Sequence, residues 1–430
     1  MIPLGESLAR LCAQHGIATF YHDIWGTRHD VPEAGLVALL AQFGVDASTP
    51  ERAASSESQA LAARWHECLA PAIAIGEGAS PWQASVRLPA SIRALGWRLS
   101  EEGGKVHEGT ADVTALRQTA RETVDDVDIV ERVLDLGVAL PAGYHRLQLL
   151  EGDRPLGEAL VIAAPARCYC PEELADGRRV WGPAVQLYSL KSERNWGIGD
   201  FSDLGRLIED WAALGAGIIG LNPLHALFPP VPRHASPYSP SSRERLNVLY
   251  LDVEAIEDFR DCAPAQQLVR SAQFQARLAN LRGTPLVDYD AVAAAKFEVL
   301  ELLWTCFRAG ELGGASQRWR AFREFQRRGG AALRRHALFE ALHAEFHAAD
   351  PSKWGWQHWP PECRTSDEAS IQRLASPRLE RVEFREYLQW QAEQQLARLA
   401  ERCEVLGMVP GLYLDLAVSV DRAGSDTWSN

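Results

Sequence analysis

The stretch from residue 183 to residue 224 constrains the fold of this chain more than any other part of the sequence. It contains a short apolar run, "PAVQLYSL", a polar loop, "KSERNWGIGD", a segment with helical periodicity, "FSDLGRLIEDWAALG", and a second apolar run, "AGIIGLNPL". Short apolar runs on either side of an amphipathic helix are typical of buried parallel strands. This order therefore predicts a strand–helix–strand unit of an α/β fold.

The sequence after this unit predicts a long helical insertion, then one more helix and one more strand. A Pro-rich loop begins near residue 225, and "DYDAVAAAKFEVLELLWTCF" is the strongest amphipathic segment that follows it. The next long helix is "FREYLQWQAEQQLARLAERCEVLG", and "GLYLDLAVSV" reads as a buried strand with one carboxylate, Asp415, in its middle. We expect residues 167–430 to form one α/β domain with a helical insertion at about 227–380.

Two smaller domains are expected before this α/β domain. Residues 1–66 carry apolar residues at three- and four-residue spacing with Gly at the end of each run, and "WGTRHDVP" between the runs reads as a loop. Residues 67–166 alternate apolar and polar residues around Gly-rich turns, as in "WQASVRLP" and "GYHRLQLLEGD". This patterning predicts a small helical domain followed by an immunoglobulin-like β-sandwich.

Charge and composition narrow the classes of partner. The net charge of −13 disfavours nucleic acid and anionic membranes, because binding to a polyanion needs clustered Lys and Arg. The sequence has no run of the roughly 20 apolar residues that a membrane span needs. Its N-terminus lacks the features of a secretion signal, so we expect a cytoplasmic protein. The eight cysteines are scattered, with one Cys-x-Cys and no second pair at zinc-site spacing, which predicts free thiols and no bound metal.

Three polar loops follow the three expected strands. They are "KSERNWGIGD", "HALFPPVPRHASPYSP" and "SVDRAGSDTWSN". In a parallel α/β sheet or barrel, ligands bind at the carboxyl ends of the strands. Each loop combines aromatic residues with Asn, Asp, Ser or His, and the CH faces of sugar rings stack on aromatic side chains. The loops therefore predict a site for neutral, hydroxyl-rich ligands, with Asn195, Trp196 and Trp428 among the candidate residues.

Three further candidates each have a structural and a functional interpretation. Asp200 stands where it can cap the following helix, with Ser202 as an alternative cap, and it can equally contact a sugar. Tyr238 lies between prolines that hold its loop extended, so its ring either packs inward or forms an aromatic ledge. Asp415 is either a structural anchor, which is the favoured interpretation, or a member of a catalytic carboxylate set. A phosphate-binding loop is not expected, because "GIGDFSDLG" lacks the third Gly at the proper offset.

These residues together resemble a known family. "VQLYSLKSERNWGIGDFSDL", "LNPLHALFP", "SPYSPSSRERLNVLYLDVE", "LVDYDAVAAAK" and "GLYLDLAVSV" are similar to bacterial 4-alpha-glucanotransferases of the amylomaltase (MalQ) type. The resemblance implies a (β/α)8 (TIM) barrel that transfers α-1,4-glucan segments between maltooligosaccharides, without cofactor or metal. It also implies that Tyr238 stacks on a glucose ring and that Asp415 matches an Asp at the end of the third barrel strand. Trp428 is expected at the start of a loop over the sugar groove.

The same resemblance leaves the reacting groups unassigned in this sequence. The family uses a retaining mechanism with an Asp nucleophile, in an Arg-x-Asp-His context, and a Glu acid/base, as the general two-carboxylate scheme requires. No Arg-x-Asp-His occurs in the chain, so no residue is assigned as catalytic.

We therefore expect the N-terminal part of such an enzyme, with an incomplete barrel of three strands. A partial barrel is expected to expose apolar surface and an unpaired strand edge, and to aggregate or to lean on its other domains. The alternatives are a non-catalytic α-glucan-binding protein, which would use the β-sandwich or the Tyr238 loop, and a related α-glucan hydrolase.

Overall fold

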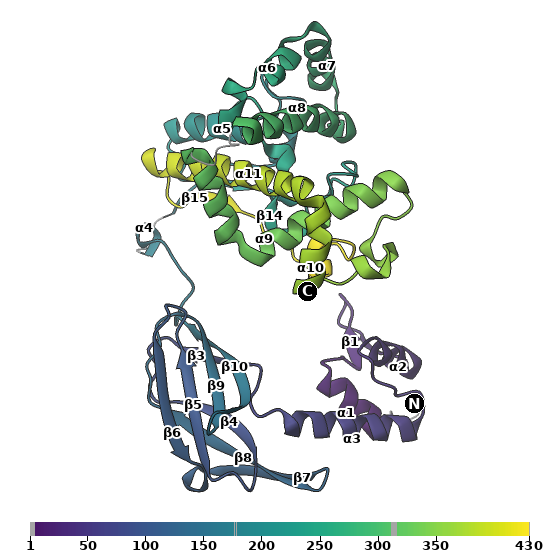
Figure 1. The fold of residues 1–430 in the computed structure, drawn as a ribbon, viewed down its shortest axis with the longest axis vertical. Helices are drawn as coiled ribbons and strands as arrows, with labels where there is room; N and C mark the ends of the chain where they lie inside the picture. Colours follow the sequence, from purple (N-terminus) through teal and green to yellow (C-terminus); the bar gives the residue numbers. More distant parts are fainter. Residues whose placement is uncertain (1–4, 176, 178, 311–315, 430) are drawn as a thin grey trace. The chain divides into compact units, whose positions relative to one another are not determined.

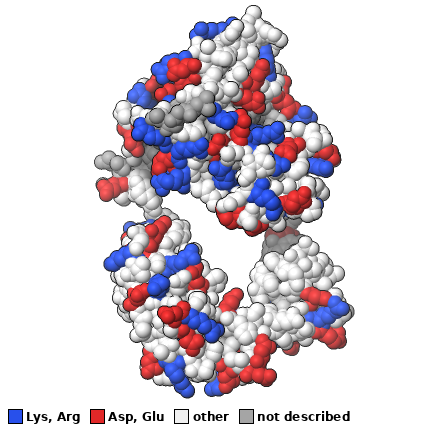
Figure 2. Space-filling view, in the orientation of Figure 1, with Lys and Arg blue, Asp and Glu red and all other residues white. Residues whose placement is uncertain are grey.

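The computed structural model describes residues 5–175, 177, 179–310 and 316–429. The chain divides into two compact units, Met1–Tyr169 and Cys170–Asn430, and each is described by itself (Figure 1). A search of the described residues for a helix long and apolar enough to cross a membrane finds none. Figure 2 shows Lys and Arg intermixed with Asp and Glu on the face in view.

The first part of unit 1 consists of helices and one short hairpin. The helices are α1 (Glu6–Gln14), α2 (Glu33–Gln42) and α3 (Pro50–His66), and the strands are β1 (Phe20–His22) and β2 (Arg28–Asp30). Leucines at helical spacing, such as Leu36 and Leu40, form the core of this part. The two quoted runs became α1 and α2, and α3 lies in the rest of the region expected to be helical. The loop expected at "WGTRHDVP" is corrected, because β2 lies within it and pairs with β1. Strands of only three residues are too short to leave an alternating pattern in the sequence.

The second part of unit 1 is a β-sandwich of two sheets, as predicted. Their orders are β3-β10-β9-β5-β6 and β4-β8-β7. The strands are β3 (Ala72–Gly76), β4 (Trp82–Pro89), β5 (Ala94–Ser100), β6 (Val106–Asp112), β7 (Gln118–Val124), β8 (Val127–Leu136), β9 (Gly143–Glu151) and β10 (Arg154–Ala164). β4 alternates more and less buried side chains along its length, and β4 and β9 contribute to one common core. One buried face per sheet explains the alternating pattern in the sequence.

Unit 2 contains a three-stranded parallel sheet with the order β11-β12-β15. The strands are β11 (Ala184–Val185), β12 (Ile218–Leu221) and β15 (Gly411–Leu414). The helix α5 (Phe201–Ala213) connects the first two, and Gly215 follows it with a φ of +86°, the conformation in which glycine commonly ends a helix. The predicted strand–helix–strand order is therefore confirmed, although β11 is shorter than the apolar run that predicted it.

The strand β15 is shorter and more exposed than the sequence suggests. Only Gly411–Leu414 of the expected buried strand is extended and paired, and the side chains of Leu414, Leu416 and Val418 are exposed. The physical reason is position: among the described strands β15 pairs with β12 alone, so it lies at the edge of the sheet. The prediction of a buried strand was therefore wrong here.

Most of unit 2 is helical. Besides α5, its helices are α4 (Glu172–Ala175), α6 (Ala263–Arg270), α7 (Ala272–Gly283), α8 (Tyr289–Gly310), α9 (Gln317–Ala349), α10 (Glu368–Ala375), α11 (Leu379–Val405) and α12 (Ser425–Ser429). In Figure 1 α11 crosses the middle of this unit, and it packs against α5, α8, α9 and β15. A hairpin of β13 (His225–Ala226) and β14 (Ser242–Leu246) precedes most of these helices. The two segments with the clearest helical periodicity became α8 and α11.

A disulfide corrects the prediction that all thiols are free. Cys262, at the start of α6, is bonded to Cys306 in α8. The cysteines that the structure leaves free are Cys12, Cys68, Cys168, Cys170, Cys363 and Cys403. The bonded pair is separated by 44 residues and belongs to no short motif, so spacing in the sequence could not reveal it.

Candidate functional site

The carboxyl ends of the three parallel strands lie side by side. Val185, Leu221 and Leu414 are paired in register across β11, β12 and β15. The three polar loops singled out in the sequence therefore start from one edge of the sheet, which is where α/β folds bind ligands. The burial of their side chains differs, however, and this difference decides which loop has residues exposed for contact with a ligand.

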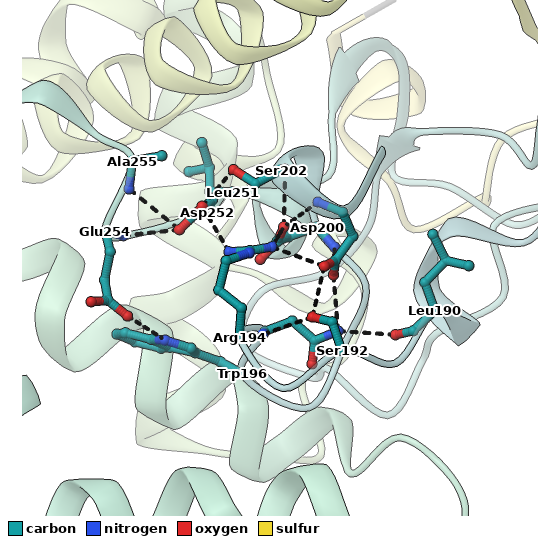
Figure 3. A network of polar contacts seen from close by, with 12 residues as sticks. Leu190, Ser192, Arg194, Trp196, Asp200, Ser202, Leu251, Asp252, Glu254 and Ala255 are labelled. Atoms are coloured by element: carbon teal, nitrogen blue, oxygen red, sulfur yellow. Dashed lines mark hydrogen bonds and ion pairs between the residues drawn. The ribbon is translucent and has the colours of Figure 1, made fainter. Parts of the chain in front are cut away.

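The loop after β11 is closed by a network of charged side chains (Figure 3). Arg194 donates from Nη1 to Asp252 Oδ2 at 2.8 Å and from Nη2 to Asp203 Oδ1 at 3.0 Å, and it also pairs with Asp200. Burial opposes the charge of Arg194, but the three carboxylates outweigh it and raise the pKa of the guanidinium. One arginine thus ties this loop to the first turn of α5 and to Asp252, 58 residues further on.

Asp200 is the N-cap of α5, as the structural interpretation of the sequence proposed. Its Oδ1 accepts from the backbone N–H of Ser202 and of Asp203, both at 3.0 Å. The Asp203 carboxylate in turn accepts from the backbone N–H of Asp200, which completes a capping box. Asp200 is 2% exposed, so its carboxylate serves the helix end and Arg194 rather than a surface.

A buried lysine extends the network from the opposite side. Lys296 of α8 is 1% exposed, and its Nζ donates to the carbonyls of Leu249 and Leu251, each at 2.7 Å. Burial lowers the pKa of Lys296, while the nearby Asp200 and Asp252 oppose that shift. Burial likewise raises the pKa of Asp200, and Lys296 opposes it. Each buried charge is therefore compensated by the other, as buried charges must be.

Asn195 and Trp196, both predicted as sugar contacts, point into the protein. Asn195 is 1% exposed, and its Nδ2 donates to Asp203 Oδ2 at 2.9 Å. Trp196 is 3% exposed, its Nε1 donates to Glu254 Oε1 at 3.1 Å, and its ring meets Phe274 edge-on at 5.2 Å. These contacts give Asn195, Trp196 and Asp200 a role in holding the loop, and they lend no support to direct contact with a sugar.

Tyr238, in the loop after β12, has the opposite environment. Its side chain is 54% exposed, and its hydroxyl lies close to the carboxylate of Asp415, which follows β15. This nearby carboxylate is the main cause of a raised pKa of Tyr238. The ring is not packed inward, so of the two interpretations the aromatic ledge fits the structure. An exposed aromatic face beside a carboxylate combines a stacking surface with an acceptor for sugar hydroxyls.

The Tyr238 loop is anchored on both sides. Ser239 Oγ donates to Asp421 Oδ2 at 3.1 Å, and the Asp421 N–H donates to the Pro240 carbonyl at 2.8 Å. Earlier in the same loop, the buried ring of Phe228 packs on Trp354 and His343, with ring centroids 4.6 Å and 5.6 Å away. The Tyr238 ring is thus exposed, while hydrogen bonds and aromatic packing fix the loop that carries it.

Trp428, the last predicted site residue, is buried at 3% exposure. Its Nε1 donates to the Cys363 carbonyl at 2.9 Å, and its ring lies 5.9 Å from Phe339. It therefore supports the third loop from inside. Of the six predicted residues, the structure brings Tyr238 and Asp415 together at the surface and buries the other four.

The sequence analysis did not single out His225 and Arg243, which also belong to this edge. His225 of β13 accepts at Nε2 from the Ala417 N–H at 3.2 Å, and Arg243 of β14 donates to the carbonyls of Ala417 and Val418. Both residues stand in the segments quoted for the family resemblance. No local pattern distinguishes them, because their partner is a backbone segment more than 170 residues away.

A hollow of about 990 Å³ lies beside Arg194, but it does not resemble a sugar site. Its lining includes Arg206, Arg398 and Arg402, and its one aromatic ring, Phe201, is 1% exposed. Within the described residues no group of three or more His, Cys, Asp or Glu side chains is arranged to hold a metal ion. The Tyr238–Asp415 pair therefore remains the best candidate for ligand contact.

Comparison with known proteins connects this geometry to a family. Residues 185–430 match the family described as "4-alpha-glucanotransferase", which is more than half of the chain. The chain belongs to the 4-alpha-glucanotransferase family. Residues 68–165 match a domain described as "MalQ N-terminal beta sandwich domain", in agreement with the two sheets of unit 1. The resemblance noted in the sequence is therefore confirmed, including its MalQ type.

Several 4-alpha-glucanotransferases match this family member over most of its length. A "4-alpha-glucanotransferase" of Mycobacterium bovis is 35% identical over 437 residues, which is 100% of this chain and 58% of the relative. A "4-alpha-glucanotransferase" of Haemophilus influenzae is 39% identical over 68% of this chain and 42% of the relative. The crystal structure of amylomaltase from Corynebacterium glutamicum matches with a TM-score of 0.78 and 27% identity, over 98% of this chain and 56% of that chain. The chain thus spans about half the length of these relatives.

Proposed function

We propose that this chain contributes to the transfer of α-1,4-glucan segments between maltooligosaccharides by binding the glucan. Membership of the 4-alpha-glucanotransferase family supports the reaction class. The observation that carries the proposal to a place on the molecule is the Tyr238–Asp415 pair, an exposed aromatic ring close to a carboxylate at the carboxyl ends of the strands of a parallel sheet. This edge is where such folds bind their ligands. A cytoplasmic location and the absence of a cofactor stay predictions.

We also propose that the sheet β11-β12-β15 belongs to a (β/α)8 barrel with a helical insertion at about 227–380. The parallel pairing of three strands, and the helices α5 and α11 that precede β12 and β15, support this assignment. The domain boundaries that we propose are 1–66, 67–166 and 167–430.

The Tyr238–Asp415 pair and the buried residues of the neighbouring loops would then have different roles toward glucan. Tyr238 stacks on a glucose ring, and Asp415 accepts hydroxyl hydrogens, because both are at the surface. Asn195, Trp196 and Asp200 act indirectly by holding the loop after β11, and Trp428 supports the loop after β15 from inside. The stacking role of Tyr238 rests on its exposure of 54%, which leaves a ring face free for a ligand.

We expect the 430-residue protein to bind maltooligosaccharide without turning it over. A retaining glycosyl transfer needs a carboxylate nucleophile and a carboxyl acid/base on opposite sides of the scissile bond. No stretch of the sequence matches the Arg-x-Asp-His context of the family's nucleophile. Asp421 and Asp426 are occupied with protein donors, Asp421 with Ser239 and Asp426 with the Arg243 N–H at 2.8 Å.

The proposal is tested by calorimetric titration of the 430-residue protein with maltohexaose. Tyr238→Ala is expected to weaken binding roughly tenfold, because it removes the stacking surface, and Tyr238→Phe is expected to lose much less. Tyr144→Ala is the matched control, since Tyr144 is a comparably exposed tyrosine of unit 1, at 61%. Equal affinity of the wild type and Tyr238→Ala would refute the assignment of the ledge. Release of glucose from maltotriose by this protein would show that its reacting carboxylates had been overlooked.

A further inference from the structure

The segment that carries Asp415 leaves the sheet at once and is held by hydrogen bonds to the β13–β14 hairpin. β15 ends at Leu414, and the following residues form no strand. The Ala417 N–H donates to His225 Nε2 at 3.2 Å. Arg243 Nη1 donates to the Ala417 carbonyl at 3.3 Å and to the Val418 carbonyl at 3.0 Å. The backbone two residues after Asp415 is therefore fixed through one imidazole and one guanidinium.

Side-chain packing contributes little to holding this segment. Ala417 is buried, but its neighbours Leu416 and Val418 are 65% and 95% exposed. A segment with so little apolar contact depends on its hydrogen bonds for a defined conformation. The next anchor is Asp421, which is bonded to Ser239 and Pro240 of the Tyr238 loop. Loss of the His225 contact would therefore leave the chain between Asp415 and Asp421 held by the two Arg243 hydrogen bonds alone.

The contact at Ala417 depends on the protonation of His225. An imidazole nitrogen accepts a hydrogen bond only in the neutral ring, because both nitrogens are donors in the cation. The charged groups that face His225 are Arg243 on β14, Asp415 itself and Asp426 on α12. Burial is the main cause of a lowered pKa of His225 and Arg243 adds to it, whereas the two carboxylates oppose the shift. The ring is thus kept in the accepting form near neutral pH.

We propose that His225 is a positioning residue of the glucan site, whose neutral imidazole holds the Ala417 backbone and so keeps Asp415 within reach of Tyr238. Protonation turns Nε2 into a donor that faces the Ala417 N–H, and the segment from 415 to 420 becomes more mobile because only the Arg243 hydrogen bonds still hold it. His225 does not need to touch the sugar for this role. The positioning itself rests on the contacts above, and only its consequence for glucan rests on the proposed function.

Hydrogen exchange of the 430-residue protein tests the positioning without any ligand. His225→Leu removes the acceptor, and we expect the protection of the amides in 415–418, corrected for the intrinsic exchange rate, to fall roughly fivefold at pH 7. His225→Gln offers an amide oxygen in the same place and is expected to keep the protection. His358→Gln is the control, because His358 is an exposed histidine of the same unit. Equal protection in the wild type and His225→Leu would overturn the proposal.

Acidification separates positioning from a general structural role. As the pH falls below 6.5, we expect the wild type to lose protection at 415–418, and His225→Gln to lose none, because its amide does not titrate. The same pair, titrated with maltohexaose, should show a several-fold loss of affinity in the wild type alone. Parallel pH profiles of the two proteins would contradict the proposal. If no protein binds maltohexaose at any pH, the proposed function fails, while the exchange measurements still decide the role of His225.

Discussion

The loops after β11 and after β12 look alike in sequence but differ in the structure. Each places an aromatic residue among prolines, glycines or carboxylates, and each starts from the same edge of the sheet. In the first, Trp196 is 3% exposed and the carboxylates are bound by Arg194. In the second, Tyr238 is 54% exposed and its hydroxyl lies close to Asp415. The comparison teaches that burial, more than residue type, distinguishes an aromatic side chain that stabilises a loop from one that is accessible to a ligand.

The largest expected effect comes from removing the buried aromatic ring. Trp196→Ala leaves a cavity beside Phe274 and an unpaired Glu254, so the free energy of unfolding of unit 2 should fall by about 3–5 kcal/mol. Tyr238→Ala should change it by less than about 0.5 kcal/mol, because that ring is exposed. Urea unfolding followed by hydrogen exchange in α5 and α8 measures both. Similar losses in the two variants would abolish the distinction between the loops.

Acid should destabilise the packing of His343 against Phe228, which belongs to the loop that carries Tyr238. His343, on which Phe228 packs, is 1% exposed, and burial is the main reason that its pKa is lowered to about 4. Above pH 6.5 the histidine is neutral in both the folded and the unfolded state, and the fold has its full stability. As the pH falls toward 4, the unfolded state binds a proton that the folded state does not, so the free energy of unfolding decreases. The difference corresponds to about 3 kcal/mol.

His343→Gln, which cannot be protonated, should lose about 3 kcal/mol less than the wild type over this pH range. The measurement is the urea midpoint of unit 2 at several pH values. A wild type and a variant with the same acid dependence would show that His343 is not the group responsible.

A smaller loss of stability is expected when Arg194, which holds the loop after β11, is replaced. Arg194→Gln leaves Asp200, Asp203 and Asp252 without their partner, and we expect a loss of about 2 kcal/mol in the free energy of unfolding of unit 2. This lies below the cost for a fully buried pair, because the Arg194 side chain is 42% exposed and solvent screens it. Arg206→Gln is the matched control, since its pair with Asp210 is exposed. A variant of Arg194 with unchanged stability but lost maltohexaose binding would make this loop a sugar surface after all.

The sequence predicted those parts of the structure whose causes lie close together in the chain. The helix α5 has strong apolar periodicity, α8 and α11 are long segments without Pro, and the cap at Asp200 needs only residues 200–203. The burial of Trp196 was missed, because it depends on Glu254 and Phe274, which are far away in sequence. The partners of Asn195, such as Asp203, are close in sequence, but the local pattern does not show that its amide turns toward them. The same holds for His225, whose partner Ala417 is 192 residues away. The exposure of β15 was also missed, since an apolar pattern reports what a strand can bury and not whether a neighbour covers it.

Oxidative footprinting in the presence of maltohexaose tests the central claim most directly. Hydroxyl radicals modify exposed aromatic side chains, and Tyr144 of unit 1, at 61% exposure, serves as the internal reference for Tyr238, at 54%. We predict that the sugar lowers the modification of Tyr238 several-fold relative to Tyr144. Unchanged modification of Tyr238, or protection of Tyr144 instead, would contradict the claim that the Tyr238–Asp415 ledge is where this protein meets glucan.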